Sequence, residues 1–295
     1  MKMIKNICKS FLFLGMMSLY ADSTSCYDIY KSSVKPNVAI ERAVFVLVDE
    51  TTIFNEKLQE QIIKNTLSKI APANYIYIGK FSAFIDNHYN EKMFEFKIDI
   101  PLSSDQRYYE RKDTLAKIDK CLKDQQGYVS GQIVQSIKKS FLNPNDDIAK
   151  SDVLYALQDF GQNVISQVEA KEKIVILASD MLENSTITSF YAKGATRLIQ
   201  PETELNKIEK SNLFSNFDNS EIYVIGTGLI SSKDNNKTYR DPKILASLKD
   251  FWTKYFVKSN GNLVEMGQPA LKNVVSSIST KIALSIFVSA FASVL

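Results

Sequence analysis

The sequence predicts an α/β fold: a doubly wound, mostly parallel sheet flanked by helices, with one antiparallel edge strand. The first observation is a set of short apolar runs, rich in β-branched residues, that end abruptly in polar residues. Such runs are typical of strands buried on both faces. The clearest are 43–48, which ends at Asp49, and 174–178, which ends at Ser179-Asp180. The second observation is that helical periodicity separates the runs, so that strands and helices alternate along the chain.

The first strand, 43–48, leads into a helix and then a second strand. Apolar side chains recur at the helical period from Phe54 to Ile70, and Ala71-Pro72 ends that helix. A strand begins at Tyr75, and the order strand, helix, strand favours a parallel pair joined by a right-handed crossover. Residues 94–100 alternate strictly between apolar and charged side chains. That alternation predicts an antiparallel edge strand with one solvent-exposed face.

The rest of the chain continues the alternation. The segment 22–42 is polar and contains Pro36, so we expect no helix there. The remaining expected elements, in order, are an exposed helix at 102–127, a helix at 128–142, a helix from Ser151, a strand at 173–179, a helix from Pro201, a strand at 221–228, a helix from Asp241 and a short strand at 262–266. Together they complete one sheet with helices on both faces.

The N-terminus predicts export. Three lysines precede the apolar run 11–17, and Ala21 is a small residue at a plausible cleavage point. An uncleaved anchor is the alternative, although the apolar run is short for a membrane span. We therefore divide the chain into a signal peptide at 1–21, a leader at 22–42, a domain at 43–270 and an apolar tail at 271–295. Cleavage takes the formal net charge from +3 to zero, so charge gives no reason to expect nucleic acid.

Export also changes how the cysteines are interpreted. Cys8 leaves with the signal peptide, while Cys26 and Cys121 remain. In an oxidising compartment such a pair predicts a disulfide. The chain-entropy model assigns the loop it would close about 4–5 kcal/mol of stabilisation. The alternative is two unrelated buried thiols.

The end of the chain is apolar. Residues 282–295 carry no charge, and Lys281 precedes them. This run is shorter than the roughly twenty residues that a membrane span needs. We expect 274–295 to form a last helix that docks on the sheet, with contact to a membrane surface or a partner as the alternative.

Acids and hydroxyls follow the expected strands at one edge of the sheet. Asp49-x-Thr51 ends the first strand, Ser151 opens a helix, and Ser179-Asp180 ends a central strand. In this order the motifs resemble the von Willebrand factor A domain, over roughly residues 43–270. That family has Asp-x-Ser-x-Ser, then a Thr or Ser before a helix, then a Thr-Asp or Ser-Asp after the fourth strand.

The resemblance implies a metal-ion-dependent adhesion site, with Asp49, Thr51, Ser151 and Asp180 holding Mg²⁺ or Mn²⁺. The donor chemistry agrees, because Mg²⁺ takes oxygen ligands and keeps several waters. The family leaves one coordination position open for an acidic side chain of a partner protein. We expect further partner contacts from residues around the same edge, namely Glu50, Glu183, Asn184 and Arg240.

Two departures make the expected site degenerate. Ile53 stands where the family has its second serine, and Met181 stands where a glycine is usual. The site therefore either binds metal weakly, with an extra water, or is a relic. The string from Ser179 to Ser185, with Thr188-Ser-Phe-Tyr191, is similar to exported or envelope-associated bacterial members that often accompany mobile elements.

Enzymatic chemistry has little support in the sequence. His88 is the only histidine, so zinc sites and Cys–His pairs lack parts, and no Gly-x-Ser-x-Gly elbow or phosphate loop occurs. We therefore expect no catalytic residues. The expected function is an exported binding module that contacts a protein partner through the strand-end site. The alternatives are a membrane-associated subunit of envelope or conjugation machinery, anchored by its tail, and a hydrolase that uses the same acids.

Overall fold

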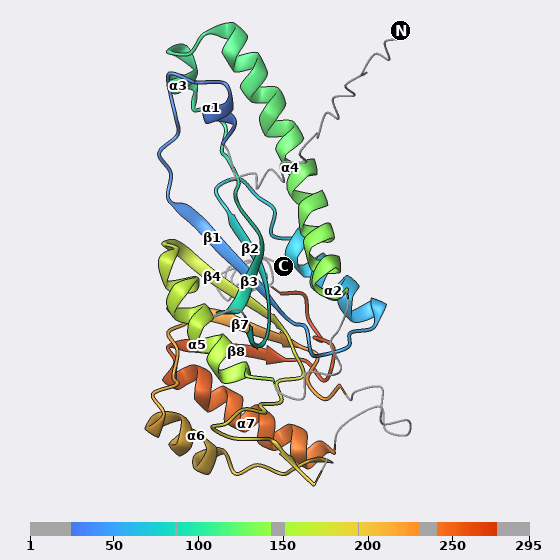
Figure 1. The fold of residues 1–295 in the computed structure, drawn as a ribbon. Helices are drawn as coiled ribbons and strands as arrows, with labels where there is room; N and C mark the ends of the chain where they lie inside the picture. The colour runs from blue at the N-terminus through green and yellow to red at the C-terminus, as the bar shows by residue number, and fades with distance from the viewer. Residues whose placement is uncertain (1–24, 86–87, 143–150, 194, 230–240, 276–295) are drawn as a thin grey trace, which may run out of the picture.

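A six-stranded sheet runs through the centre of the molecule (Figure 1). The computed structural model describes residues 25–85, 88–142, 151–193, 195–229 and 241–275. The strand order is β3-β2-β1-β4-β7-β8, and every pairing is parallel except that of β3 with β2. The strands are β1 (Ile40–Asp49), β2 (Tyr75–Ile85), β3 (His88–Lys97), β4 (Ala170–Ala178), β7 (Ser220–Ile225) and β8 (Gly261–Met266). The predicted fold class is confirmed, including the antiparallel edge strand.

Helices cover both faces of this sheet. On one face lie α2 (Glu56–Leu67) and α4 (Lys112–Ser140), and on the other α5 (Val153–Asn163), α6 (Pro201–Lys210) and α7 (Pro242–Lys258). Successive strand residues point to opposite faces, so Phe45 packs with α5 and α7 while Val46 packs with α2 and α4. Both are fully buried. This explains why the central strands appear in the sequence as continuous apolar runs rather than alternating ones.

Several elements differ from those expected. The leader contains a short helix, α1 (Cys26–Ile29), because Ser25 caps it and Pro36 lies beyond its end. The two helices expected at 102–142 are instead a five-residue helix, α3 (Ser104–Tyr108), and the single long helix α4. The connection at 186–199 holds a small hairpin of β5 (Tyr191–Ala192) and β6 (Ala195–Thr196), and a 3₁₀ turn, η1 (Ile165–Gln167), follows α5.

A disulfide-linked lobe projects from one end of the sheet. It comprises residues 25–38 and 99–125, which include α1, α3 and the first half of α4. The predicted bond between Cys26 and Cys121 is confirmed, with the two Cα atoms 5.9 Å apart. A small core of Tyr27, Leu102 and Ile118 lies beneath it. The lobe joins the start of β1 and the end of β3, so it lies at the amino edge of the sheet, where the parallel strands begin.

The first part of the apolar tail is bound to α2. Gln61 exchanges two hydrogen bonds with the backbone of Leu271, at 2.9 and 3.0 Å. One and two helical turns further on, Asn65 accepts the Val275 amide at 2.9 Å and Lys69 donates to the Val275 carbonyl at 2.5 Å. The predicted signal peptide, 1–21, and the tail beyond 275 lie outside the described residues. Within the described ranges, no helix is both long and apolar enough to cross a membrane.

Candidate functional site

Asp49 is the centre of a polar network at the carboxyl edge of the sheet, where the parallel strands end. It is the last residue of β1 and is fully buried. Its Oδ1 accepts the Thr51 amide at 2.9 Å and the Thr51 hydroxyl at 2.6 Å. Its Oδ2 accepts the Ser179 hydroxyl at 2.7 Å and the Thr52 hydroxyl at 3.3 Å. Burial raises the pKa of the Asp49 carboxyl, and these hydrogen bonds act in the opposite direction.

Thr51 and Ser151 bring the first and second predicted motifs together. The Thr51 Oγ1 lies 3.4 Å from the Ser151 Oγ, although the two residues are 100 positions apart in the chain. Ser151 is not the helix cap, since α5 begins at Val153 with Asp152 in the cap position. The Ser151 carbonyl instead accepts the Asn184 amide at 3.0 Å. This bond fixes the Ser151 loop against the loop that follows β4.

Asp180 completes the convergence of three loops. Its backbone amide donates to the Thr52 hydroxyl at 3.3 Å, and its Oδ1 accepts the Leu182 amide at 2.9 Å. Thr52 and Ser179 were not expected as site residues, yet both bind the Asp49 carboxylate. Only the Asp49-x-x-Thr52 spacing and the Ser before Asp180 could have pointed to them. The structure therefore brings together all four predicted metal-site residues and adds two hydroxyls.

The donor set fits a magnesium ion in chemical terms. The Thr51 hydroxyl donates a hydrogen bond to Asp49, which leaves the lone pairs of the hydroxyl oxygen available to a cation. Thr51, Ser151 and Asp180 would hold the ion, while Asp49 orients Thr51. One carboxylate with hydroxyls and water suffices for Mg²⁺. Among the described residues, no group of three or more His, Cys, Asp or Glu side chains could hold a metal, so such a site would depend on these hydroxyls.

The two departures from the family motif have distinct structural outcomes. Ile53 is 38% exposed and leaves one oxygen donor missing at its position. Met181 adopts a left-handed backbone, with φ of 61°, which explains why a glycine suits this position. Its side chain is fully buried, and its carbonyl accepts the Trp252 indole N–H at 2.9 Å. Burial and this hydrogen bond hold Met181 in a conformation that costs a non-glycine residue about 1 kcal/mol or more.

Gly226 lets a neighbouring turn approach the site closely. It follows β7 with φ of 114°, and a Cβ there would lie 2.8 Å from the Ser179 carbonyl oxygen and 2.6 Å from the Phe54 ring. Any side chain would push the β7 turn away from Ser179. Residues 226–229 therefore form a tight turn beside the site, closed by the Leu229 amide bonding the Gly226 carbonyl at 3.0 Å.

Glu183, expected as a partner contact, does not lie on the surface. It is fully buried, and its Oε2 accepts the Leu154 amide at 2.8 Å. Leu154 is in the first turn of α5, and Asp152 makes no side-chain cap there, so Glu183 caps this helix from a distant loop. Burial raises the pKa of Glu183 to about 8.

The other expected partner contacts lie at or near the edge. Glu50 forms an ion pair with Lys80, which also bonds Glu91 at 3.0 Å. Asn184 is half-buried and accepts the Ser189 hydroxyl at 2.8 Å. Arg240 lies outside the described residues. Tyr89 and Tyr155, which the sequence did not single out, stack with ring centroids 5.4 Å apart, and Tyr155 is on α5.

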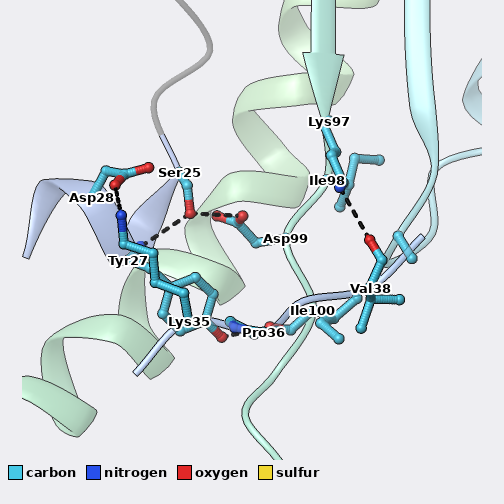
Figure 2. Close-up of a pocket in the computed structure, with 11 residues that line it drawn as sticks. Ser25, Tyr27, Asp28, Lys35, Pro36, Val38, Lys97, Ile98, Asp99 and Ile100 are labelled. Atoms are coloured by element: carbon cyan, nitrogen blue, oxygen red, sulfur yellow. Dashed lines mark hydrogen bonds and ion pairs between the residues drawn. The ribbon is translucent and has the colours of Figure 1, made fainter. Parts of the chain in front are cut away.

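A cavity of about 220 Å³ lies at the opposite edge of the sheet, between the leader and the end of β3 (Figure 2). Its polar groups bond one another. Asp99 accepts the Ser25 hydroxyl at 2.8 Å and the Cys26 amide at 2.7 Å, and the Lys97 ammonium donates to the Val38 carbonyl at 3.2 Å. These contacts fasten the leader to the sheet rather than mark a ligand site.

No family model matches this chain, and a search of curated proteins finds no match. Among solved structures, it is similar to the VWA domain of SpRpn10, with 10% identity over 80% of this chain and 92% of that one and a TM-score of 0.34. It is also similar to the conserved hypothetical protein BatB of Bacteroides thetaiotaomicron, with 12% identity, 86% and 99% coverage and a TM-score of 0.33. A third similar structure contains three N-terminal domains of the type V pili tip protein Mfa5 from Porphyromonas gingivalis, with 16% identity over 50% of this chain and a TM-score of 0.30. This chain spans only 21% of the Mfa5 chain.

The chain has a doubly wound α/β fold of the kind that the von Willebrand factor A resemblance implies. Because the TM-scores are all below 0.5, this statement rests on the strand order of the chain itself, its one antiparallel edge strand and its helices on both faces. The motifs that carried the resemblance lie at the carboxyl edge of the sheet, in three loops that contact one another. Membership in the subgroup associated with mobile elements stays a prediction.

Proposed function

We propose that this protein is an exported binding module that grips a protein partner through the carboxyl edge of its sheet, with Mg²⁺ or Mn²⁺ as the bridging ion. One observation carries the proposal. Three loops that carry oxygen donors meet there, with the Thr51 and Ser151 hydroxyls 3.4 Å apart and the Asp180 backbone amide bonded to the Thr52 hydroxyl. A bound ion would supply a positive centre that accepts a carboxylate from the partner.

The arrangement supports binding rather than catalysis. The buried Asp49 carboxylate receives four hydrogen bonds, which occupy its acceptor capacity and leave it poorly placed to take a proton from a substrate. Its role in this proposal is to orient Thr51, Thr52 and Ser179. The disulfide supports the proposed export, since such bonds persist in oxidising compartments.

Calorimetric titration of the mature protein with Mg²⁺ and with Mn²⁺ tests the proposal. We expect saturable binding by the parent protein and none by Asp180→Ala, with Asp49→Ala greatly weakened. Glu91→Ala is a matched control, because this exposed acid pairs with Lys80 at the rim of the same edge. Its affinity for the ion should be unchanged.

The absence of binding heat in the parent, with all variants folded by circular dichroism, would eliminate the metal-dependent function. Equal binding by the parent and Asp180→Ala would move the ion to another site. Neither result would alter the fold assignment, which rests on the sheet.

A further inference from the structure

The disulfide-linked lobe ends in an exposed aromatic surface. At the end of α3, Tyr108 is 84% exposed and Tyr109 is 74% exposed, with their rings edge-to-face at 5.4 Å. At the end of α1, Ile29 is 52% and Tyr30 38% exposed. The Ser33 hydroxyl donates to the Tyr109 carbonyl at 3.4 Å, which holds the segment after α1 against the end of α3. We call Ile29, Tyr30, Tyr108 and Tyr109 the aromatic tip.

The aromatic tip is presented on a well-connected scaffold. The α3 helix begins with a reciprocal capping box between Ser103 and Gln106. Arg107, one residue before Tyr108, makes two parallel bonds to Asp119 of α4, at 2.7 and 2.8 Å. Glu110, one residue after Tyr109, accepts the Ser32 hydroxyl at 2.6 Å and the Ser33 amide at 2.7 Å. The residues on both sides of the two tyrosines are therefore held in place, which keeps the tyrosine rings at the surface and outside the small core of the lobe.

The lobe extends well beyond the sheet. Gln125 of α4 bonds Asp99, just past the end of β3, so it marks the level of the amino edge. From Gln125 back to Lys112 the helix continues for about 20 Å, at 1.5 Å per residue. Figure 1 shows α1 and α3 at this far end of α4, away from the sheet. The part of the lobe that carries α3 and the start of α4 therefore projects beyond the amino edge.

The apolar tail leaves the described part of the chain at the same edge. Val275 is held by Lys69, which follows the end of α2 and precedes the start of β2. Six residues, 276–281, separate Val275 from the uncharged run 282–295. An extended chain of that length spans at most about 20 Å, which matches the reach of the lobe. The uncharged run is short for a membrane span and would need a second contact to hold it at a membrane.

We propose that the aromatic tip contacts a lipid surface alongside the tail, so that the lobe holds the sheet off the bilayer and the carboxyl edge faces away from it. Tyrosine suits the headgroup region, because its ring is apolar and its hydroxyl stays hydrated. Lys31 and Lys112 flank the tip in sequence and supply cations for anionic headgroups, while Arg111 pairs with Asp113 at 3.1 Å. The proposal does not depend on a metal ion at the strand-end site.

A tryptophan placed at the tip tests this orientation. The mature full-length protein carrying Tyr108→Trp is mixed with vesicles of phosphatidylethanolamine and phosphatidylglycerol that contain brominated lipid, with a chelator present. The matched control is Leu198→Trp, since Leu198 is 59% exposed and precedes α6 at the carboxyl edge. The native Trp252 is fully buried in both proteins and contributes an equal background. We expect brominated lipid to quench Tyr108→Trp and not Leu198→Trp.

A second measurement separates the tip from the tail. In vesicle flotation, Tyr108→Ser with Tyr109→Ser should weaken binding by roughly tenfold, about 1.4 kcal/mol, while Leu198→Ser should not. Tail-dependent binding without quenching at position 108 would overturn the proposal and leave the tip for a protein partner. Failure of the full-length protein to bind these vesicles would overturn it as well.

Discussion

Charged side chains have different partners at the two edges of the sheet. At the amino edge, charges on or just before neighbouring strands are paired: Arg42 with Glu172 at 2.6 Å, Lys171 with Glu41 at 2.7 Å, and Lys173 with Asp218. At the carboxyl edge, Asp49 and Glu183 are buried and have no Lys or Arg partner within the part of the chain that the structure describes. Hydroxyls and a backbone amide bond the Asp49 carboxylate instead, and the Leu154 amide bonds Oε2 of Glu183.

We take the paired charges of the amino edge as stabilising ion pairs and the buried carboxylates of the carboxyl edge as marks of a candidate binding site. A buried carboxylate without a cation is disfavoured in its charged form, and such groups concentrate where proteins bind ligands. Glu204, on α6, is a buried acid that does have cationic partners. Burial alone would raise its pKa, but bonds from Thr188, Lys207 and Arg197 outweigh burial and hold the pKa below its ordinary value. Asp49 and Glu183 have no Lys or Arg partner among the described residues, which sets the carboxyl edge apart.

The largest expected effect is at the amino edge. Replacing Cys26 and Cys121 together by serine should lower the free energy of unfolding by about 4–5 kcal/mol, because the bond closes a loop of 95 residues. Urea unfolding of parent and variant measures this loss. Magnesium affinity, measured by calorimetry, should not change if the two edges act independently. A loss of less than about 1 kcal/mol would show that the lobe is held by its packing alone.

The next effect is a pH dependence at the carboxyl edge. Because the folded-state pKa of Glu183 is about 8 and its ordinary value is 4.5, the folded protein binds the extra proton between these limits. Stability is therefore full below the lower value and falls as pH rises, by up to about 1.4 kcal/mol per pH unit. Glu183→Gln should flatten this slope in urea unfolding between pH 5 and 8.

Glu204→Gln is the control for that slope. Its carboxylate is favoured in the folded state, so its contribution is lost as pH falls through its lowered pKa, and it adds no slope between pH 5 and 8. An unchanged slope in Glu183→Gln would assign the pH dependence to another group.

A smaller effect restores the missing donor. Ile53→Ser places a hydroxyl where the family motif has its second serine, and Ile53 is partly exposed, so the fold should tolerate the change. One more oxygen ligand in place of a water should tighten Mg²⁺ binding roughly tenfold in calorimetry. Ile53→Ala is the matched control without the hydroxyl. Equal affinity in both variants would mean that position 53 does not face the ion.

The smallest effect is at an amino-edge pair. Glu172→Gln removes the partner of Arg42, and both side chains are partly exposed, at 30% and 25%. The loss should be about 0.5–1 kcal/mol and should shrink in high salt, since exposed pairs are screened. A larger loss of unfolding free energy that persists in high salt would show that this amino-edge pair contributes as much to stability as a buried pair does.

The sequence by itself determined the layers of the fold and the positions of the strand-end acids. Short apolar runs rich in β-branched residues indicated strands buried on both faces, and alternation at 94–100 indicated a strand with one exposed face. Parallel strands bring their carboxyl ends to one edge, so Asp49 and Asp180 had to lie near each other. The disulfide was predicted from the two cysteines that the expected signal-peptide cleavage would leave, and the structure bonds Cys26 to Cys121.

Tertiary structure alone decided how the acids are satisfied and what projects from the sheet. Thr52 bonds Asp49 because its loop folds back over the strand end, and Glu183 caps a helix that begins thirty residues earlier in the chain. Neither contact can be recognised from a periodic pattern in the sequence, because hydrogen bonds between distant loops depend on packing and not on spacing along the chain. The same reason applies to the lobe. The charge-rich segment 102–127 predicted an exposed helix, but the orientation of that helix relative to the sheet depends on its disulfide and its packing with α1.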